Sequence, residues 1–182
     1  GIPTPAFGSV QPGDVKYRDL DKNGVVDQND VTQVGKSPFP EWYFSFGGKI
    51  AWKGFDLEVL FQGAAGMSVN ILDNKNQVVA FVNNGNAYDI AKGAWAYYPE
   101  QGIDTRATAT YPRLTTQSNE NNYQTSSMWV KNADYLKLRN LELGYNINAR
   151  KLQRAGVDNL RVYLSAQNLL AFSGLLKHYN MD

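Results

Sequence analysis

Carboxylate and amide side chains recur at short intervals in Asp19–Asp30, whose sequence is D-L-D-K-N-G-V-V-D-Q-N-D. A calcium ion takes roughly six to eight oxygen ligands, and a twelve-residue loop supplies them from its first, third, fifth, seventh, ninth and twelfth positions. Gly24, at the sixth position, permits the sharp turn that such a loop needs. The spacing therefore predicts a calcium ion bound by Asp19, Asp21, Asn23, Val25 through its carbonyl oxygen, Asp27 and Asp30.

Two features of this loop depart from a helix–loop–helix calcium site. The twelfth position holds Asp30, which is shorter than the glutamate that usually binds with both oxygens. The flanking sequences V-K-Y-R and V-T-Q-V-G-K-S-P are poor helix formers. The alternative is an acidic loop of Asx turns that binds no metal.

The sequence shows no arrangement of residues typical of a catalytic site. The chain has no cysteine, and its one histidine, His178, has no acid or nucleophile at a useful spacing. Asp56 and Glu58 share one face of a predicted strand at a separation near that of an inverting glycosidase. Nothing in the sequence tunes either carboxyl group for catalysis, so we expect ordinary surface charges and no enzyme.

The elements that must position these residues are strands. In Asn159–Leu170 apolar and polar residues alternate, which is the period of a strand and not of a helix. The same alternation runs through Trp42–Trp52, and after Lys53-Gly54 it resumes with opposite parity in Phe55–Phe61. A two-residue turn that ends in glycine between two such runs predicts a hairpin.

A fourth strand is expected from Trp129 to Ile147. Its apolar residues change parity near Arg139 and Asn140, which indicates a β-bulge. In the last predicted strand only Asn168 breaks the alternation.

Connection lengths distinguish the two architectures that fit such strands. The connections at one end are short, and those at the other end, residues 1–41, 65–128 and the tail from 171, are long. This asymmetry favours an outer-membrane β-barrel with short periplasmic turns and long extracellular loops. Four strands cannot close such a barrel, so we expect the chain to be a fragment. The alternative is a soluble calcium-dependent carbohydrate-binding β-sandwich, whose apolar faces pack on each other.

Residues 65–128 are rich in Asn, Gln, Thr, Tyr and Gly, and they include three closely spaced aromatic residues, Trp95, Tyr97 and Tyr98. Aromatic rings among amides suit contact with a sugar or with a partner protein, because large aromatic side chains dominate interface energetics. Packing within the loop itself is the alternative. A formal charge of +1 without a basic stripe argues against a nucleic-acid partner.

Five segments that cover most of the chain resemble the C-terminal part of SusC/RagA-type TonB-dependent transporters, in the same order and spacing. They are Gly13–Asp30, Trp52–Gly63, Tyr111–Leu114, Asn132–Tyr145 and Leu160–Leu169.

The resemblance implies an all-β, antiparallel fold that forms part of a plugged barrel of roughly 22 strands in the bacterial cell outer membrane. It also implies import of large glycan or peptide oligomers in Bacteroidetes, energised by TonB through parts not in this chain, beneath a SusD-like lipoprotein lid. The barrel wall would contact outer-membrane lipid. Neither a plug, a TonB-contacting segment nor a terminal strand is evident in this sequence.

The resemblance also divides the chain into five parts. Residues 1–41 are expected to form an extracellular loop with the calcium motif, 42–64 a hairpin, 65–128 a second extracellular loop and 129–170 a second hairpin. Residues 171–182 would begin a further extracellular loop.

Overall fold

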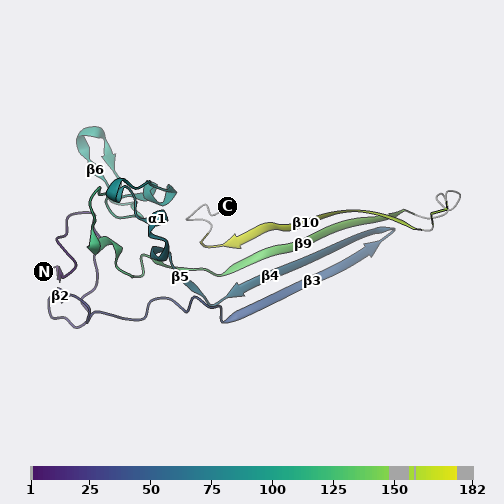
Figure 1. The fold of residues 1–182 in the computed structure, drawn as a ribbon, viewed down its shortest axis with the longest axis horizontal. Coiled ribbons are helices and arrows are strands. Elements are labelled where there is room, and N and C mark those ends of the chain that lie inside the picture. The colour runs from purple at the N-terminus through teal and green to yellow at the C-terminus, as the bar shows by residue number, and fades with distance from the viewer. Residues whose placement is uncertain (1, 148–155, 158, 176–182) are drawn as a thin grey trace. The chain divides into compact units, whose positions relative to one another are not determined.

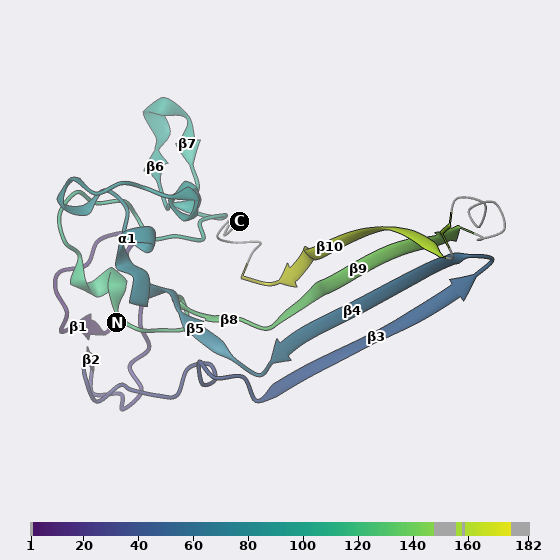
Figure 2. The same cartoon turned by 45° about the vertical axis from the view of Figure 1, so that its right-hand side comes forward.

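The computed structural model describes residues 2–147, 156–157 and 159–175, drawn as ribbons in Figure 1 and Figure 2. These residues fall into two compact units, and each is described by itself. One unit, here called the loop unit, comprises residues 2–35 and 69–131. The other, called the sheet unit, comprises residues 36–68 together with the described residues from 132 onward.

Four long strands make up the sheet unit and lie side by side in Figure 1 and Figure 2. The sheet is antiparallel, in the order β10-β9-β4-β3. The strands are β3 (Trp42–Trp52), β4 (Phe55–Ala65), β9 (Tyr135–Ile147) and β10 (Leu160–Ser173). The predicted all-β, antiparallel fold is therefore confirmed.

A two-residue turn joins β3 to β4, as the sequence predicts. Lys53 and Gly54 both have positive φ angles, 47° and 91°. Positive φ at both central residues is the geometry of a type I′ turn, whose twist matches that of the flanking strands. The Asn146 N–H of β9 donates a hydrogen bond to the Gly54 carbonyl at 2.7 Å, which connects the turn to the next strand.

Most apolar residues of the four strands share one face of the sheet, as their alternation predicts. One row of cross-strand partners on this face consists of Ile50, Leu57, Leu143 and Leu164. Two further rows are Trp52, Phe55, Tyr145 and Val162, then Phe46, Phe61, Leu138 and Leu170. Within the described residues Ile50 remains 69% exposed and Leu164 75% exposed. This surface is here called the apolar face.

The β-bulge lies where the sequence changes parity. The register of β4 against β9 shifts between Leu60 and Phe61, which leaves Arg139 as an extra residue of β9. On β10 the register also shifts, and there Asn168 has a φ of 52°. Asparagine tolerates this left-handed conformation better than most residues do. Its side-chain oxygen accepts a hydrogen bond from Arg139 at 2.8 Å, so the two irregular positions stabilise each other.

The expected strand from Trp129 begins later than predicted. The long strand β9 begins at Tyr135, and the three residues of β8 (Val130–Asn132) pair separately with β5 (Ser68–Asn70). Asp134 interrupts the strand because its carboxylate accepts hydrogen bonds from the N–H groups of Gly66 at 2.8 Å and Met67 at 3.1 Å. Trp129 itself is buried in the loop unit.

The loop unit has a hydrophobic core of its own, built from short elements. Trp129 is 1% exposed and lies against Tyr111 and Tyr123, with ring centroids 5.7 Å away in both cases. Its indole N–H donates to the Asn122 carbonyl at 2.8 Å. The other buried members of this core are Leu72, Val78, Ala80 and Ala91. The segments expected to be two separate loops therefore contribute to one compact unit.

The short elements of the loop unit are one α-helix, several 3-10 helices and paired short strands. The helices are η1 (Ile71–Asn74), α1 (Lys75–Val78), η2 (Val82–Asn84), η3 (Asp89–Gly93), η4 (Pro99–Gln101) and η5 (Glu120–Tyr123). The strands β1 (Thr4–Pro5) and β2 (Val25–Val26) pair in parallel, and β6 (Tyr97–Tyr98) and β7 (Ile103–Asp104) pair antiparallel. None of the helices in the described ranges is long and apolar enough to cross a membrane.

Candidate functional site

On the polar face of the sheet, Arg161 of β10 reaches across β9 to Asp56 of β4. Its Nε lies 3.0 Å from Asp56 Oδ1, and its Nη2 lies 2.6 Å from Glu142 Oε1. Gly144 of β9 stands between them, and a Cβ at this position would come within 2.5 Å of Asp56 Oδ2. Glycine is therefore the residue that leaves room for this ion pair, and Asp56 is only 5% exposed.

The acid pair of Asp56 and Glu58 does not form an acid–base site. Asp56 is paired with Arg161, and Glu58 lies 3.5 Å from Lys49 of β3. Each carboxylate thus has its own cation, whereas a general acid must keep its proton at neutral pH. Positive and negative charges are therefore paired on the polar face of the sheet. His178 lies outside the described residues.

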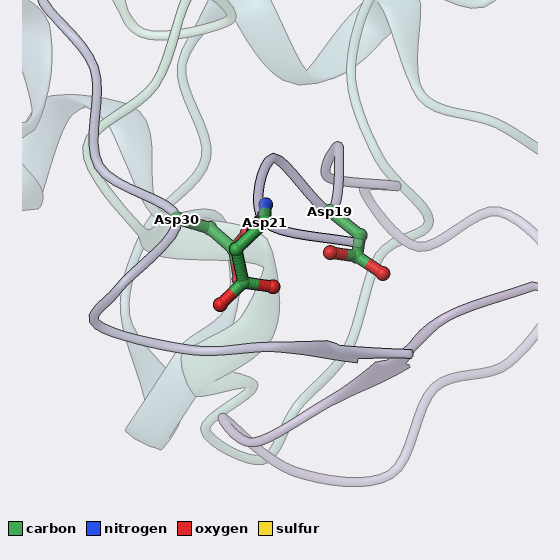
Figure 3. A group of neighbouring side chains, drawn as sticks. All are labelled: Asp19, Asp21 and Asp30. Carbon is green, nitrogen blue, oxygen red and sulfur yellow. Dashed lines mark hydrogen bonds between the residues drawn. The ribbon is translucent and has the colours of Figure 1, made fainter. Parts of the chain in front are cut away.

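The predicted calcium loop brings three of its carboxylates together. Oxygen atoms of Asp19, Asp21 and Asp30 lie within 4.8 Å of one another, and Figure 3 shows these side chains on the loop. Asp19 is at the first position of the motif and Asp30 at the twelfth, so the loop folds back on itself as a cation-binding loop must.

Backbone N–H groups hold these carboxylates in place. Asp19 accepts hydrogen bonds from Lys22 at 2.6 Å and Gly24 at 2.8 Å. Asp30 accepts from Asp27 at 2.9 Å and Leu20 at 2.6 Å. These backbone donors, first Asp27 and then Leu20, lower the pKa of Asp30 below its ordinary value. Asp30 is therefore ionised at neutral pH, as a ligand for a hard cation must be.

The other three predicted ligands are engaged in local hydrogen bonds. Asn23 donates to Asp21 at 2.9 Å and accepts from the Val25 N–H at 2.7 Å. Asp27 accepts from the Asn29 N–H at 2.7 Å and is not a member of the carboxylate cluster. Val25 belongs to β2, which pairs with β1 and so fixes the second half of the loop.

The three candidate contact residues of the second loop differ in their surroundings. Trp95 is half-buried and packs on Gly13, where a Cβ would come within 2.5 Å of the indole ring. Tyr97 and Tyr98 lie in the β6–β7 hairpin, which projects from the rest of the loop unit in Figure 1 and Figure 2, and both are exposed. The Arg106 guanidinium lies 3.7 Å from the centre of the Tyr97 ring. The hairpin thus presents two aromatic rings to solvent.

Comparisons with known proteins show which proteins the chain is similar to. No family model matches it. TonB-dependent receptors P3 and P26 of Formosa agariphila are 28% and 30% identical to it, over 91% and 88% of its length. The chain is thus similar to TonB-dependent receptors over most of its own length. It spans 15% of the length of these receptors, and its predicted SusC/RagA-type relationship is confirmed.

Solved structures agree with this similarity to TonB-dependent receptors. The RagAB peptide transporter is 25% identical to this chain, with a TM-score of 0.61. The matched region covers 90% of this chain and 17% of the transporter chain. The RagAB peptide importer in the closed-closed state is 25% identical to this chain, with a TM-score of 0.59. The matched region covers 89% of this chain and 17% of the importer chain. The chain is thus assigned to the outer membrane, and its four-stranded sheet has the fold of part of an outer-membrane β-barrel.

A polar cluster in the loop unit has no counterpart in the sequence patterns. The Asp14 carboxylate is 2% exposed and lies 2.7 Å from Arg113 Nε. It also accepts hydrogen bonds from the side-chain amides of Asn119 at 3.0 Å and Asn122 at 2.9 Å. These partners lie about a hundred positions away in sequence, so no spacing rule reveals them. The cluster joins the first loop to the second.

Proposed function

We propose that the complete protein imports nutrient oligomers, either glycans or peptides, across the outer membrane in a TonB-dependent manner. This chain supplies barrel wall and extracellular loops. The observation that carries the proposal is the apolar face, which continues without interruption over four neighbouring strands while charges pair on the opposite face. A barrel wall between lipid and a polar lumen requires this division.

The soluble β-sandwich is the less favoured function. A sandwich covers the apolar face of one sheet with that of another. In the described part of the chain the remaining sheets have two strands each, which is too little to cover four strands of eleven to fourteen residues. Similarity to TonB-dependent receptors supports the barrel as well.

In this proposal the chain performs no covalent chemistry. Lipid contacts the apolar face, and the Lys53-Gly54 turn lies on the periplasmic side. The loop unit, which contains the long connections, lies on the extracellular side. TonB acts through parts of the protein outside this chain.

Calcium is proposed to hold the Asp19–Asp30 loop. Three carboxylates whose oxygens lie within 4.8 Å of one another repel each other unless a cation or protons neutralise them. Lys22 is the one basic residue of the loop sequence, and it donates to Asp19 through its backbone N–H, which carries no charge. The donor set is entirely oxygen, which suits calcium better than a transition metal.

Removal of two ligands tests the calcium proposal. We expect the purified complete protein to contain calcium, measured by elemental analysis after dialysis, and Asp21→Asn with Asp30→Asn to lose that calcium. The same double variant should make the loop as sensitive to protease as the wild type becomes in a calcium chelator. Asp73→Asn, an exposed carboxylate of the loop unit outside the motif, is the matched control. Unchanged calcium content in the double variant would contradict the proposal.

The β6–β7 hairpin is proposed to contact a SusD-like lipoprotein lid. Exposed aromatic residues on a projecting hairpin are typical of binding hot spots. Tyr97 and Tyr98 are 43% and 56% exposed, while Trp95 supports the base of the hairpin.

Uptake and co-purification test both the import function and the lid contact. In cells, uptake of labelled oligomers should depend on the complete protein and cease when TonB is deleted. Replacing Trp95, Tyr97 and Tyr98 together by alanine should leave surface abundance unchanged while lowering lid co-purification and uptake. TonB-independent uptake would refute the import proposal. Normal abundance with unchanged lid binding would refute only the contact, and turnover of substrate by the purified protein would refute the absence of chemistry.

A further inference from the structure

The loop unit contains a hollow that none of the predicted site residues lines. Its walls come from the first loop near Phe7, from Phe81, and from the irregular segment Arg113–Glu120. Its volume is about 660 Å³. Ligand sites in proteins fall in this range of size, and they combine an apolar surface with a few polar groups.

Phe81 occupies a backbone conformation that large side chains avoid. Its φ is 63°, in the left-handed region that favours glycine and asparagine. The neighbouring residue Ala80 is 2% exposed and donates its N–H to the hydroxyl of Tyr111 at 3.2 Å, which anchors the chain on one side. On the other side the Asn83 N–H donates to the Thr116 carbonyl at 3.2 Å.

The result of this strained turn is an aromatic ring that lines the hollow. Phe81 is 45% exposed, although the adjacent residue, Ala80, belongs to the buried core of the loop unit. A glycine would adopt this left-handed backbone conformation with less strain than phenylalanine does. Strained residues held by their surroundings cluster at ligand-binding sites.

Most of the polar groups around this ring are hydroxyls and amides, and the one carboxylate among them belongs to Glu120. Arg113 is paired with Asp14 at 2.7 Å, and the Glu120 carboxylate accepts a hydrogen bond from Ser118 at 2.8 Å. The uncharged polar residues of the lining include Ser9, Gln11, Thr115, Thr116, Gln117 and Asn119. The one cation among the described lining residues, Arg113, is therefore already paired, which disfavours an anionic ligand.

We propose that this hollow binds a neutral glycan, with one sugar ring lying on the face of Phe81. The flat aromatic face matches the apolar C–H face of a pyranose, and hydroxyl and amide side chains both donate to and accept from sugar hydroxyls. Arg113–Glu120 contains no strand, so it offers no edge with which the backbone of an extended peptide could pair. The site rests on the proposed import function and specifies its substrate class.

Binding to the purified complete protein tests this site. The probes are neutral hexasaccharides of β1,3-linked glucose, β1,4-linked glucose, β1,4-linked xylose, β1,4-linked mannose and α1,4-linked glucose, together with an uncharged peptide mixture rich in Ser, Thr and Asn. We expect at least one hexasaccharide to bind. Phe81→Leu should raise its dissociation constant at least about tenfold, because the flat ring is lost, and Phe81→Tyr should retain binding.

Matched measurements separate this site from a general fault of folding or of transport. Tyr88→Leu, an exposed aromatic residue of the same unit that does not line the hollow, should bind like the wild type. Binding of no hexasaccharide, binding of the peptides alone, or equal affinity in Phe81→Leu and wild type would each overturn the proposal. Normal TonB-dependent uptake in Phe81→Leu would refute this site and leave the import function standing. Phe81-dependent binding without TonB-dependent uptake would support this site and refute the import function.

Discussion

Leu164→Arg in the complete receptor is expected to cost about 2–4 kcal/mol of barrel stability, because it places a charge on the lipid-facing surface near mid-membrane. Leu164 is the fifth of the 14 residues of β10, lies opposite Leu143 and is 75% exposed on the apolar face. Folding into lipid vesicles at graded urea concentrations measures this loss directly. Surface abundance in cells should fall in parallel.

The adjacent position provides the control for this effect. Ser165 pairs with Glu142 on the opposite, polar face, so Ser165→Arg places the same charge toward the lumen. We expect this variant to fold with nearly wild-type stability. Equal stability of the two arginine variants would show that the assignment of the two faces is wrong.

Trp129→Ala is expected to destabilise the loop unit by about 3–5 kcal/mol, the usual range for removal of a large buried aromatic side chain. The substitution leaves a cavity between Tyr111 and Tyr123 and removes the partner of the Asn122 carbonyl. The loss should be confined to the loop unit, because the long strands have their own hydrogen-bonded ladder.

Hydrogen exchange of the complete protein distinguishes a local from a global effect. In Trp129→Ala, the backbone amides of Leu72 and Ala91 should exchange far faster, while those of β4 and β9 keep their protection. Tyr88→Ala removes an exposed aromatic ring from the same unit and should change neither set. Unchanged exchange of the core amides in Trp129→Ala would contradict the independent core.

The sequence alone determined the strands, the hairpin turn and the family. Alternation of apolar and polar residues has the period of a strand. It also restricts how neighbouring strands pair, because a shift of one residue would move the apolar side chains to the polar face. Lys53-Gly54 encodes its turn through local φ preferences, and the parity change near Arg139 encodes the bulge. The motif spacing likewise brought Asp19 and Asp30 within reach of each other. All of these depend on residues that are close in sequence.

The tertiary structure alone decided which distant residues meet. Trp129 reads as the beginning of a strand, yet the aromatic cluster with Tyr111 and Tyr123 places it in a separate core. The sequence shows Gly144 only as one residue of a strand. In the structure the Arg161 side chain passes over Gly144 to reach Asp56, so a larger residue would not fit there. These contacts depend on the energy of burying and pairing groups that are far apart along the chain. Periodicity and spacing relate only residues that are close in sequence, so they cannot predict contacts between distant ones.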